Sequence, residues 1–185
     1  FMRNNRGNVP KASDKINLDV LKKHCSNLDL SNNDNLNFWL YCRISMLTGL
    51  RSVDILNMRV SDISFKNGMV RLTEKKTGKK VQAPLSKEVL SQIKKDNEFV
   101  IFNDKYKTNV SLMTINRRLK SIYKDSDRNI SSHSIRKATA TKVYQATGND
   151  IVKAMIFLNH SSPITTKNYL NITNEEKLEL YSFLD

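Results

Sequence analysis

Apolar residues recur at helical spacing in two segments near the start of the chain. The clearer segment runs from about Asp34 to Leu47, and its apolar positions are Leu36, Trp39, Leu40, Ile44 and Leu47. Residues three and four apart share one face of a helix, so this pattern predicts a helix, which Gly49 ends. A weaker helix is expected from about Asn17, and a short one from Ser52 to Met58.

The pattern changes to short β-prone runs between residues 60 and 85. The turns Lys66-Asn67-Gly68 and Lys76-Thr77-Gly78 separate these runs and suit tight hairpins. The segment therefore predicts a three-stranded antiparallel meander. Its three runs are Val60–Phe65, Met69–Lys75 and Lys79–Leu85.

Helical spacing returns after Pro84 and continues to the end of the chain. The predicted helices are Lys87–Lys95, Leu112–Lys124, His133–Thr147, Asp150–Leu158, Thr165–Leu170 and Asn174–Phe183. The predicted class is α+β, mainly α-helical with one small three-stranded antiparallel sheet. Residues 1–12 are polar and basic and predict a linker or arm. A single domain is expected over residues 13–172, followed by a tail at 173–185.

The charge of the chain points to a polyanionic partner. Thirty-one Lys and Arg face 18 Asp and Glu, which leaves a net charge of +13. Such an excess attracts nucleic acid, although a merely basic protein is the plain alternative. No apolar run approaches the ~20 residues of a membrane span, and the first residues do not resemble a secretory signal. A cytoplasmic protein is therefore expected, with no membrane partner.

Two cysteines, Cys25 and Cys42, lie in apolar-periodic segments without a neighbouring Cys or His cluster. Two buried free thiols are the expected state. A structural zinc site would need more ligands than these two residues offer, so no metal is expected.

Six polar residues have ordinary explanations when each is taken alone. Arg51 could be a surface arginine, and Lys76 a solvated lysine in a turn. His133 and Arg136 could cap a helix or form a salt bridge. His160 could cap a helix or pack in the core, and Tyr169 is one of six tyrosines. Together they suit displacement of an alcohol from a phosphodiester. Arginines stabilise the non-bridging oxygens, histidine and lysine move protons, and tyrosine serves as the nucleophile.

The order and spacing of these residues resemble the tyrosine recombinase (phage integrase) family. The resemblance extends from about Asn17 to Leu170, and His160 precedes Tyr169 by nine residues, as the family pattern requires. The matching strings are Thr48-Gly49-Leu50-Arg51, Lys76-Thr77-Gly78-Lys79, His133-Ser134-Ile135-Arg136, Leu158-Asn159-His160-Ser161-Ser162 and Thr165-Thr166-Lys167-Asn168-Tyr169.

The resemblance implies a role for each matching residue. Arg51 and Arg136 would clamp the scissile phosphate, and Tyr169 would attack it. Lys76 would protonate the departing 5′ oxygen, with Lys75 and Lys79 as alternatives if the turn is shifted. His133 would assist proton transfer, and His160 would bond or pack at the phosphate. Asp54 would support the site from behind, although an exposed aspartate is equally expected at this position.

The implied reaction is site-specific DNA recombination through a 3′-phosphotyrosine intermediate, without a metal or another cofactor. The implied partner is double-stranded DNA with a specific recombination site, bound by a homotetramer of subunits that are monomers in isolation. A bacterial or phage protein associated with the nucleoid is expected. The tail at 173–185 would pack on a neighbouring subunit or on its own domain.

Two departures from the family pattern carry expectations of their own. Asn159 stands where the family usually has glycine, and asparagine also tolerates a left-handed turn. The family's N-terminal helical domain does not precede Asn17, so the chain is either an excised catalytic domain or a short recombinase. A type IB topoisomerase and a non-catalytic DNA-binding regulator of the same fold are the alternative functions.

Overall fold

The central helix of the molecule, α2 (Asn33–Thr48), is buried on nearly every side. A computed structural model describes residues 13–172 of the chain. Asn32 starts the helix by accepting hydrogen bonds from the backbone N–H groups of Asp34 and Asn35, and Gly49 ends it in the left-handed region at φ 61°. Because buried apolar side chains point from α2 in most directions, other elements pack about it. Its buried apolar side chains are Leu36, Phe38, Trp39, Leu40, Tyr41, Cys42 and Ile44.

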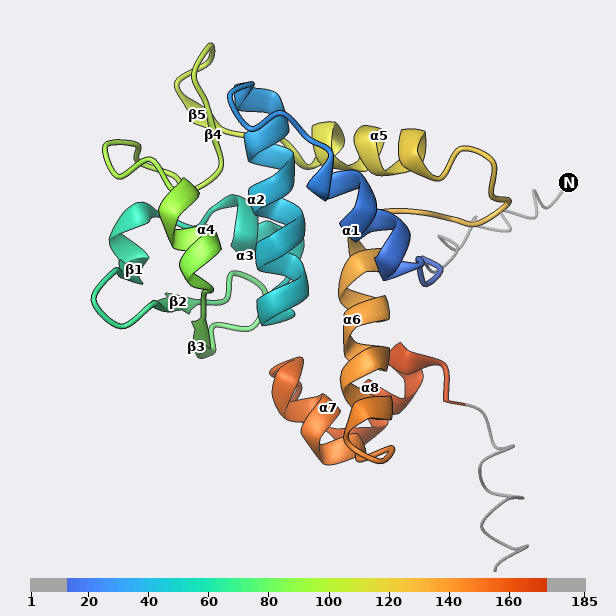
Figure 1. Ribbon diagram of the computed structural model, residues 1–185. Coiled ribbons are helices and arrows are strands. Elements are labelled where there is room, and N and C mark those ends of the chain that lie inside the picture. The colour runs from blue at the N-terminus through green and yellow to red at the C-terminus, as the bar shows by residue number, and fades with distance from the viewer. Residues whose placement is uncertain (1–12, 173–185) are drawn as a thin grey trace, which may run out of the picture.

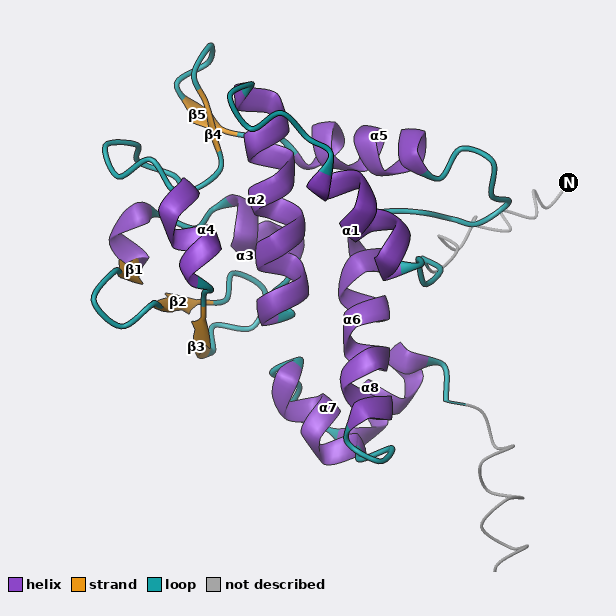
Figure 2. Cartoon of the chain, in the orientation of Figure 1, coloured by secondary structure: helices purple, strands orange, loops and turns teal. Residues whose placement is uncertain are grey.

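The remaining elements surround α2 and extend beyond one end of it (Figure 1). The other helices are α1 (Leu18–Ser26), α3 (Ser52–Leu56), the 3-10 turn η1 (Val60–Asp62), α4 (Lys87–Gln92), α5 (Leu112–Ile122), α6 (Ser132–Ala146), α7 (Ile151–Phe157) and α8 (Pro163–Leu170). The strands are β1 (Ile63–Ser64), β2 (Met69–Thr73), β3 (Lys80–Pro84), β4 (Phe102–Asn103) and β5 (Thr108–Asn109). Figure 2 shows that helices dominate the described chain, so the predicted mainly α-helical class is confirmed.

The predicted three-stranded sheet is confirmed, with antiparallel order β1-β2-β3. Its first strand is shorter than expected because residues 60–62 form η1. There the Arg59 N–H donates to the Asp62 carboxylate at 2.8 Å, and the Val60 N–H donates to the Glu98 carbonyl at 3.1 Å. The hairpin of β4 and β5 was not predicted, because strands of two residues are too short to show an alternating pattern.

The described chain has two hydrophobic cores, joined by α6. The larger core surrounds α2 and includes Ile135 and Ala138 from the first half of α6. The smaller core lies between the second half of α6 and the helices α7 and α8, and its buried members are Ala140, Tyr144, Ala154, Leu158 and Leu170. Figure 1 shows α7 and α8 at the end of α6 that lies away from α1 and α5.

Three further expectations from the sequence concern the two cysteines, membrane spans and the ends of the chain. Cys25 and Cys42 are buried free thiols, as predicted. No helix among residues 13–172 is long and apolar enough to cross a membrane. The predicted helix at 174–183, the arm at 1–12 and the tail at 173–185 lie outside the described residues.

Gly49 gives a testable prediction, because it meets α7 at the junction of the two cores. Its φ is positive, and a Cβ there would lie 2.4 Å from the Phe157 ring. Gly49→Ala combines backbone strain with a steric clash, so we expect it to lower the free energy of unfolding by about 2–3 kcal/mol. Gly148 also has a positive φ but open space around it, so Gly148→Ala should lose only about 1 kcal/mol. Equal losses in urea denaturation would contradict the packing of Phe157 on Gly49.

Candidate active site

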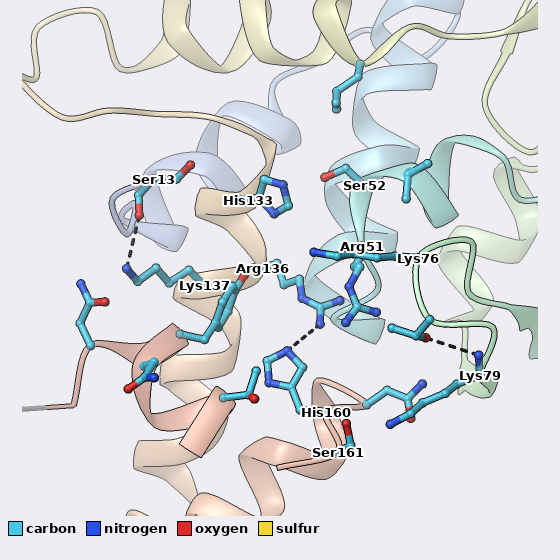
Figure 3. Close-up of a pocket in the computed structure, with 18 residues that line it drawn as sticks. Ser13, Arg51, Ser52, Lys76, Lys79, His133, Arg136, Lys137, His160 and Ser161 are labelled. Atoms are coloured by element: carbon cyan, nitrogen blue, oxygen red, sulfur yellow. Dashed lines mark hydrogen bonds between the residues drawn. The ribbon is translucent and has the colours of Figure 1, made fainter. Parts of the chain in front are cut away.

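The six residues singled out from the sequence all line one cleft, which has a volume of about 920 Å³. They come from five separate parts of the chain: the start of α3, the turn between β2 and β3, α6, the loop after α7, and α8. Figure 3 shows the side chains of Arg51, Lys76, His133, Arg136 and His160 gathered in this cleft. Tyr169, the sixth of these residues, also lines the cleft. The structure therefore brings together residues as far apart in sequence as Arg51 and Tyr169.

Arg51 is placed by the sharp change of direction between α2 and α3. After the left-handed Gly49, the chain turns, and Arg51 becomes the N-terminal boundary residue of α3. Its Nη1 donates to the Glu74 carboxylate at 2.5 Å, and its side chain is 15% exposed. The guanidinium is therefore fixed on one side and open to the cleft on the other.

Lys76 lies in the turn between β2 and β3, as the sequence predicts. The turn is closed by a hydrogen bond from the Gly78 N–H to the Glu74 carbonyl at 2.9 Å. Asp54 supports it from α3, because its Oδ1 accepts from the Lys75 N–H at 2.8 Å. Asp54 is 3% exposed and does not line the cleft, and burial raises the pKa of its carboxyl. Lys79 shares the cleft with Lys76, whereas Lys75 does not line it.

The first turn of α6 directs His133 and Arg136 toward the cleft. The Ser131 hydroxyl caps the helix by accepting from the His133 N–H at 3.2 Å. Arg136 is only 3% exposed, and its Nη2 donates to the Leu158 carbonyl at 2.8 Å. This bond ties α6 to the end of α7. Burial lowers the pKa of His133, and repulsion from Arg136 and Lys76 lowers it further, so the imidazole is neutral at pH 7.

Asn159 turns the chain back from α7 toward the cleft and so places His160. Its φ is 51°, which confirms the left-handed turn expected of asparagine at this position. His160 Nδ1 lies 3.0 Å from the Thr166 hydroxyl, and its Nε2 lies 3.5 Å from Arg136 Nη2. Burial lowers the pKa of His160 to about 4, with Arg136 adding to the effect. His160 is therefore also neutral at pH 7.

Tyr169 lies on α8, which begins with the Ser162 cap and Pro163 in its first turn. Its ring meets His160 edge-on, with centroids 5.6 Å apart, and the Arg136 guanidinium carbon lies 5.9 Å from the ring centroid. The hydroxyl is buried and has no hydrogen bond of normal geometry within the described residues. Burial raises the pKa of Tyr169, and Arg136 opposes that rise. At pH 7 the phenol therefore keeps its proton and needs a base to become a nucleophile.

The cleft is built to receive an anion. Its described lining contains no Asp or Glu, and its cationic side chains are Arg51, Lys76, Lys79, Arg136 and Lys137. Burial lowers the pKa of Lys137, whose ammonium donates to the Ser13 carbonyl at 3.4 Å. Guanidinium and ammonium groups both bind phosphate oxygens, so a cleft lined by these five side chains suits a phosphate group.

Sequence reasoning missed three residues of this site. Glu74 is a buried carboxylate under Arg51, and its only sequence signal is an acidic residue directly before a lysine-rich turn. Thr166 is fully buried against His160, and nothing distinguishes it from other hydroxyl residues in the chain. Ser13 lines the cleft through folding of the segment before α1, which no local pattern predicts.

Comparison with known proteins identifies the family of this chain. The model of the phage integrase family matches residues 17–176. The chain belongs to the phage integrase family. A probable integrase/recombinase of Acholeplasma phage L2 is 27% identical over 173 residues, which are 89% of this chain and 58% of that protein. Tyrosine recombinase XerA of Pyrococcus horikoshii is 28% identical over 181 residues, which are 92% and 61% of the two chains. The chain thus spans about three fifths of these relatives.

Solved structures of recombinases and integrases share the fold. XerH site-specific recombinase, in a pre-cleavage complex with its difH substrate, has a TM-score of 0.70 at 19% identity and covers 94% of this chain and 55% of that one. A lambda integrase dimer bound to a core site has a TM-score of 0.65 at 21% identity, covering 86% and 49%. The predicted catalytic-domain fold of this phage integrase family member is therefore confirmed.

The lowered pKa of His160 predicts a pH dependence of stability. Between pH 6.5 and about 4 the unfolded chain binds a proton on this residue that the folded chain does not. Folding therefore becomes less favourable as pH falls through this window. We expect His160→Gln, which cannot titrate, to lose less in Tm than the unsubstituted chain between pH 7 and pH 5. The same Tm loss in both proteins, measured by circular dichroism, would show that folding does not lower the pKa of His160.

Proposed function

We propose that this protein cuts and rejoins DNA strands at a specific recombination site, with Tyr169 as the covalent nucleophile. The observation that carries the proposal is the cleft in which five cations and Tyr169 meet without an acidic lining residue. The relatives that match the chain are described as integrases and recombinases, and XerH and lambda integrase have been solved on DNA. These descriptions favour recombination over the topoisomerase and regulator alternatives.

In the proposed cleavage step, Tyr169 Oη attacks the phosphorus of a DNA phosphodiester. Arg51 and Arg136 bind the non-bridging oxygens, whose charge grows in the transition state. The phenolic proton passes to His133, which is able to accept it because its imidazole is neutral. A P–O bond to Tyr169 forms and the P–O5′ bond breaks.

The departing 5′ oxygen takes its proton from the Lys76 ammonium, which leaves a free 5′ hydroxyl and a 3′-phosphotyrosine. In the joining step, the 5′ hydroxyl of another strand attacks this phosphotyrosine and returns a proton to Lys76. Tyr169 regains its proton from His133. Each step exchanges one phosphoester bond for another, so the proposed reaction needs no nucleotide triphosphate.

His160 has a different proposed role, because Thr166 and Arg136 flank its two ring nitrogens. Because Arg136 can only donate to Nε2, Nδ1 carries the proton in the free chain and donates to the Thr166 hydroxyl. To donate to a phosphate oxygen, His160 would shift its proton to Nε2 and accept from Thr166 at Nδ1. Asp54 would hold the backbone beside Lys76 through its bond to the Lys75 N–H. We further propose that the protein acts as a homotetramer on two DNA sites, as the resemblance to the family implies.

The nucleophile assignment predicts a covalent adduct. We expect a pool of nicked DNA duplexes, incubated with the chain, to yield an adduct at Tyr169 that survives denaturing electrophoresis. Peptide mass spectrometry locates the attachment. Tyr169→Phe should abolish the adduct because it removes the attacking oxygen. Tyr106→Phe should keep it, because Tyr106 is exposed and does not line the cleft. An adduct of equal yield with Tyr169→Phe would refute the assignment.

The cationic cleft predicts a steep salt dependence of DNA binding. Each phosphate neutralised by a lysine or arginine releases a counterion, so log affinity falls linearly with log salt. We expect Lys79→Ala to reduce the magnitude of this slope by about one. Lys22→Ala is the matched control, because Lys22 is exposed on α1 and pairs with Asp19. A flat salt dependence, or equal slopes for the two variants in fluorescence anisotropy, would contradict phosphate binding by this cleft.

A further inference from the structure

Glu74 is a buried carboxylate at the base of the candidate site. It follows the last residue of β2 and begins the turn that carries Lys76. Its side chain has no exposed surface, and it does not line the cleft. A charged carboxylate in such a position is stable only when strong donors surround it.

The donors to Glu74 come from two different parts of the site. Arg51 Nη1 donates to its Oε1, and the Thr77 hydroxyl donates to its Oε2, both at 2.5 Å. The backbone of Glu74 also closes the turn, since its carbonyl accepts from the Gly78 N–H and its N–H donates to the Lys79 carbonyl, each at 2.9 Å. Glu74 therefore contacts both Arg51, which is proposed to bind the phosphate, and Thr77, which follows Lys76 in the turn.

We propose that Glu74 is a positioning residue that holds the Lys76 turn against Arg51. This inference rests on the proposed function, in which Arg51 binds the non-bridging oxygens and Lys76 protonates the leaving oxygen of the same phosphate. The distance between these two side chains must fit one phosphate group. Glu74 sets that distance by bonding to Arg51 with one oxygen and to Thr77 with the other.

The placement of Glu74 argues against competition with the phosphate for Arg51. Glu74 lies outside the cleft lining, whereas Arg51 lines the cleft. A guanidinium has five N–H donors, and among residues 13–172 only Glu74 accepts from Arg51, through one of its nitrogens, so the other nitrogens are available for phosphate oxygens. Glu74 therefore supports Arg51 from the buried side. Asp54 adds a second link between the same elements, from α3 to the Lys75 N–H.

A substrate with an altered leaving group tests the effect on Lys76. When sulfur replaces the bridging 5′ oxygen, the leaving thiolate is stable without a proton, so a general acid is no longer needed. We expect Glu74→Ala to slow cleavage of ordinary DNA at least tenfold and to recover most of that rate on the sulfur substrate, as Lys76→Ala should. Arg51→Ala should not recover. Glu74→Gln, which keeps the shape and one acceptor, should lie between Glu74→Ala and the unsubstituted chain.

Loss of the same size on both substrates would show that Glu74 does not act through Lys76, and an unchanged rate would show that it positions neither residue. Glu98→Gln is the matched control, because Glu98 forms an exposed ion pair with Arg59 at 2.6 Å. It should cleave both substrates at the unsubstituted rate. Circular dichroism checks that each variant is folded, and Glu74→Gln carries the test if Glu74→Ala is not.

Hydrogen exchange of the free chain tests the same link without DNA, so its result stands even if the proposed function fails. Because Glu74 joins Arg51 to the turn, Arg51→Ala should speed exchange of the backbone amides in residues 74–79 severalfold, as Glu74→Gln should. Glu98→Gln should leave that exchange unchanged. Unchanged exchange in Arg51→Ala would overturn the proposed link. Absence of any covalent adduct with the unsubstituted chain would instead refute the proposed function alone.

Discussion

Repulsion among the cationic side chains of the cleft is the constraint on which the rest of the site depends. Two unit charges 4 Å apart interact by about 4 kcal/mol near a protein surface, so several cations in one cleft need compensation. Two buried carboxylates supply this compensation from the side away from the cleft. Glu74 pairs with Arg51, and Asp54 lies close enough to Arg51 and Arg136 to interact with their charges. The Leu158 carbonyl takes one donor of Arg136. The cleft surface remains free for a phosphate.

The same repulsion controls the protonation of the neighbouring residues. His133 and His160 both have lowered pKa values because of burial and the adjacent arginines. Neutral imidazoles can accept protons, whereas imidazolium groups would add further positive charge to a crowded cleft. The arrangement that binds an anion therefore also produces the proton acceptor that an attack by Tyr169 needs.

Much of this site could be predicted from sequence because its residues lie at the boundaries of elements with strong local signals. Gly49, Gly78 and Asn159 mark left-handed turns, and each lies within two positions of a residue predicted to act in the site. Glu74 and Thr166 could not be predicted, because their importance comes from partners that only the fold brings close. The hairpin of β4 and β5 was missed for a different reason, since two-residue strands depend on pairing rather than on a periodic pattern.

The division into two cores has a consequence for control. Arg51 and Lys76 belong to elements around the larger core, whereas His160 and Tyr169 are carried by elements of the smaller one. Among residues 13–172 the smaller core has five buried members, and α6, Arg136 and the Phe157 contact hold it to the rest. Small clusters open at lower free energy than large ones. A shift of α7 or α8 would therefore move Tyr169, the proposed nucleophile, away from Arg51 and Lys76, and would also displace the Leu158 carbonyl that holds Arg136. Under the proposed function, such a protein would hold its substrate at Arg51 and Lys76 without reacting until these two short helices move.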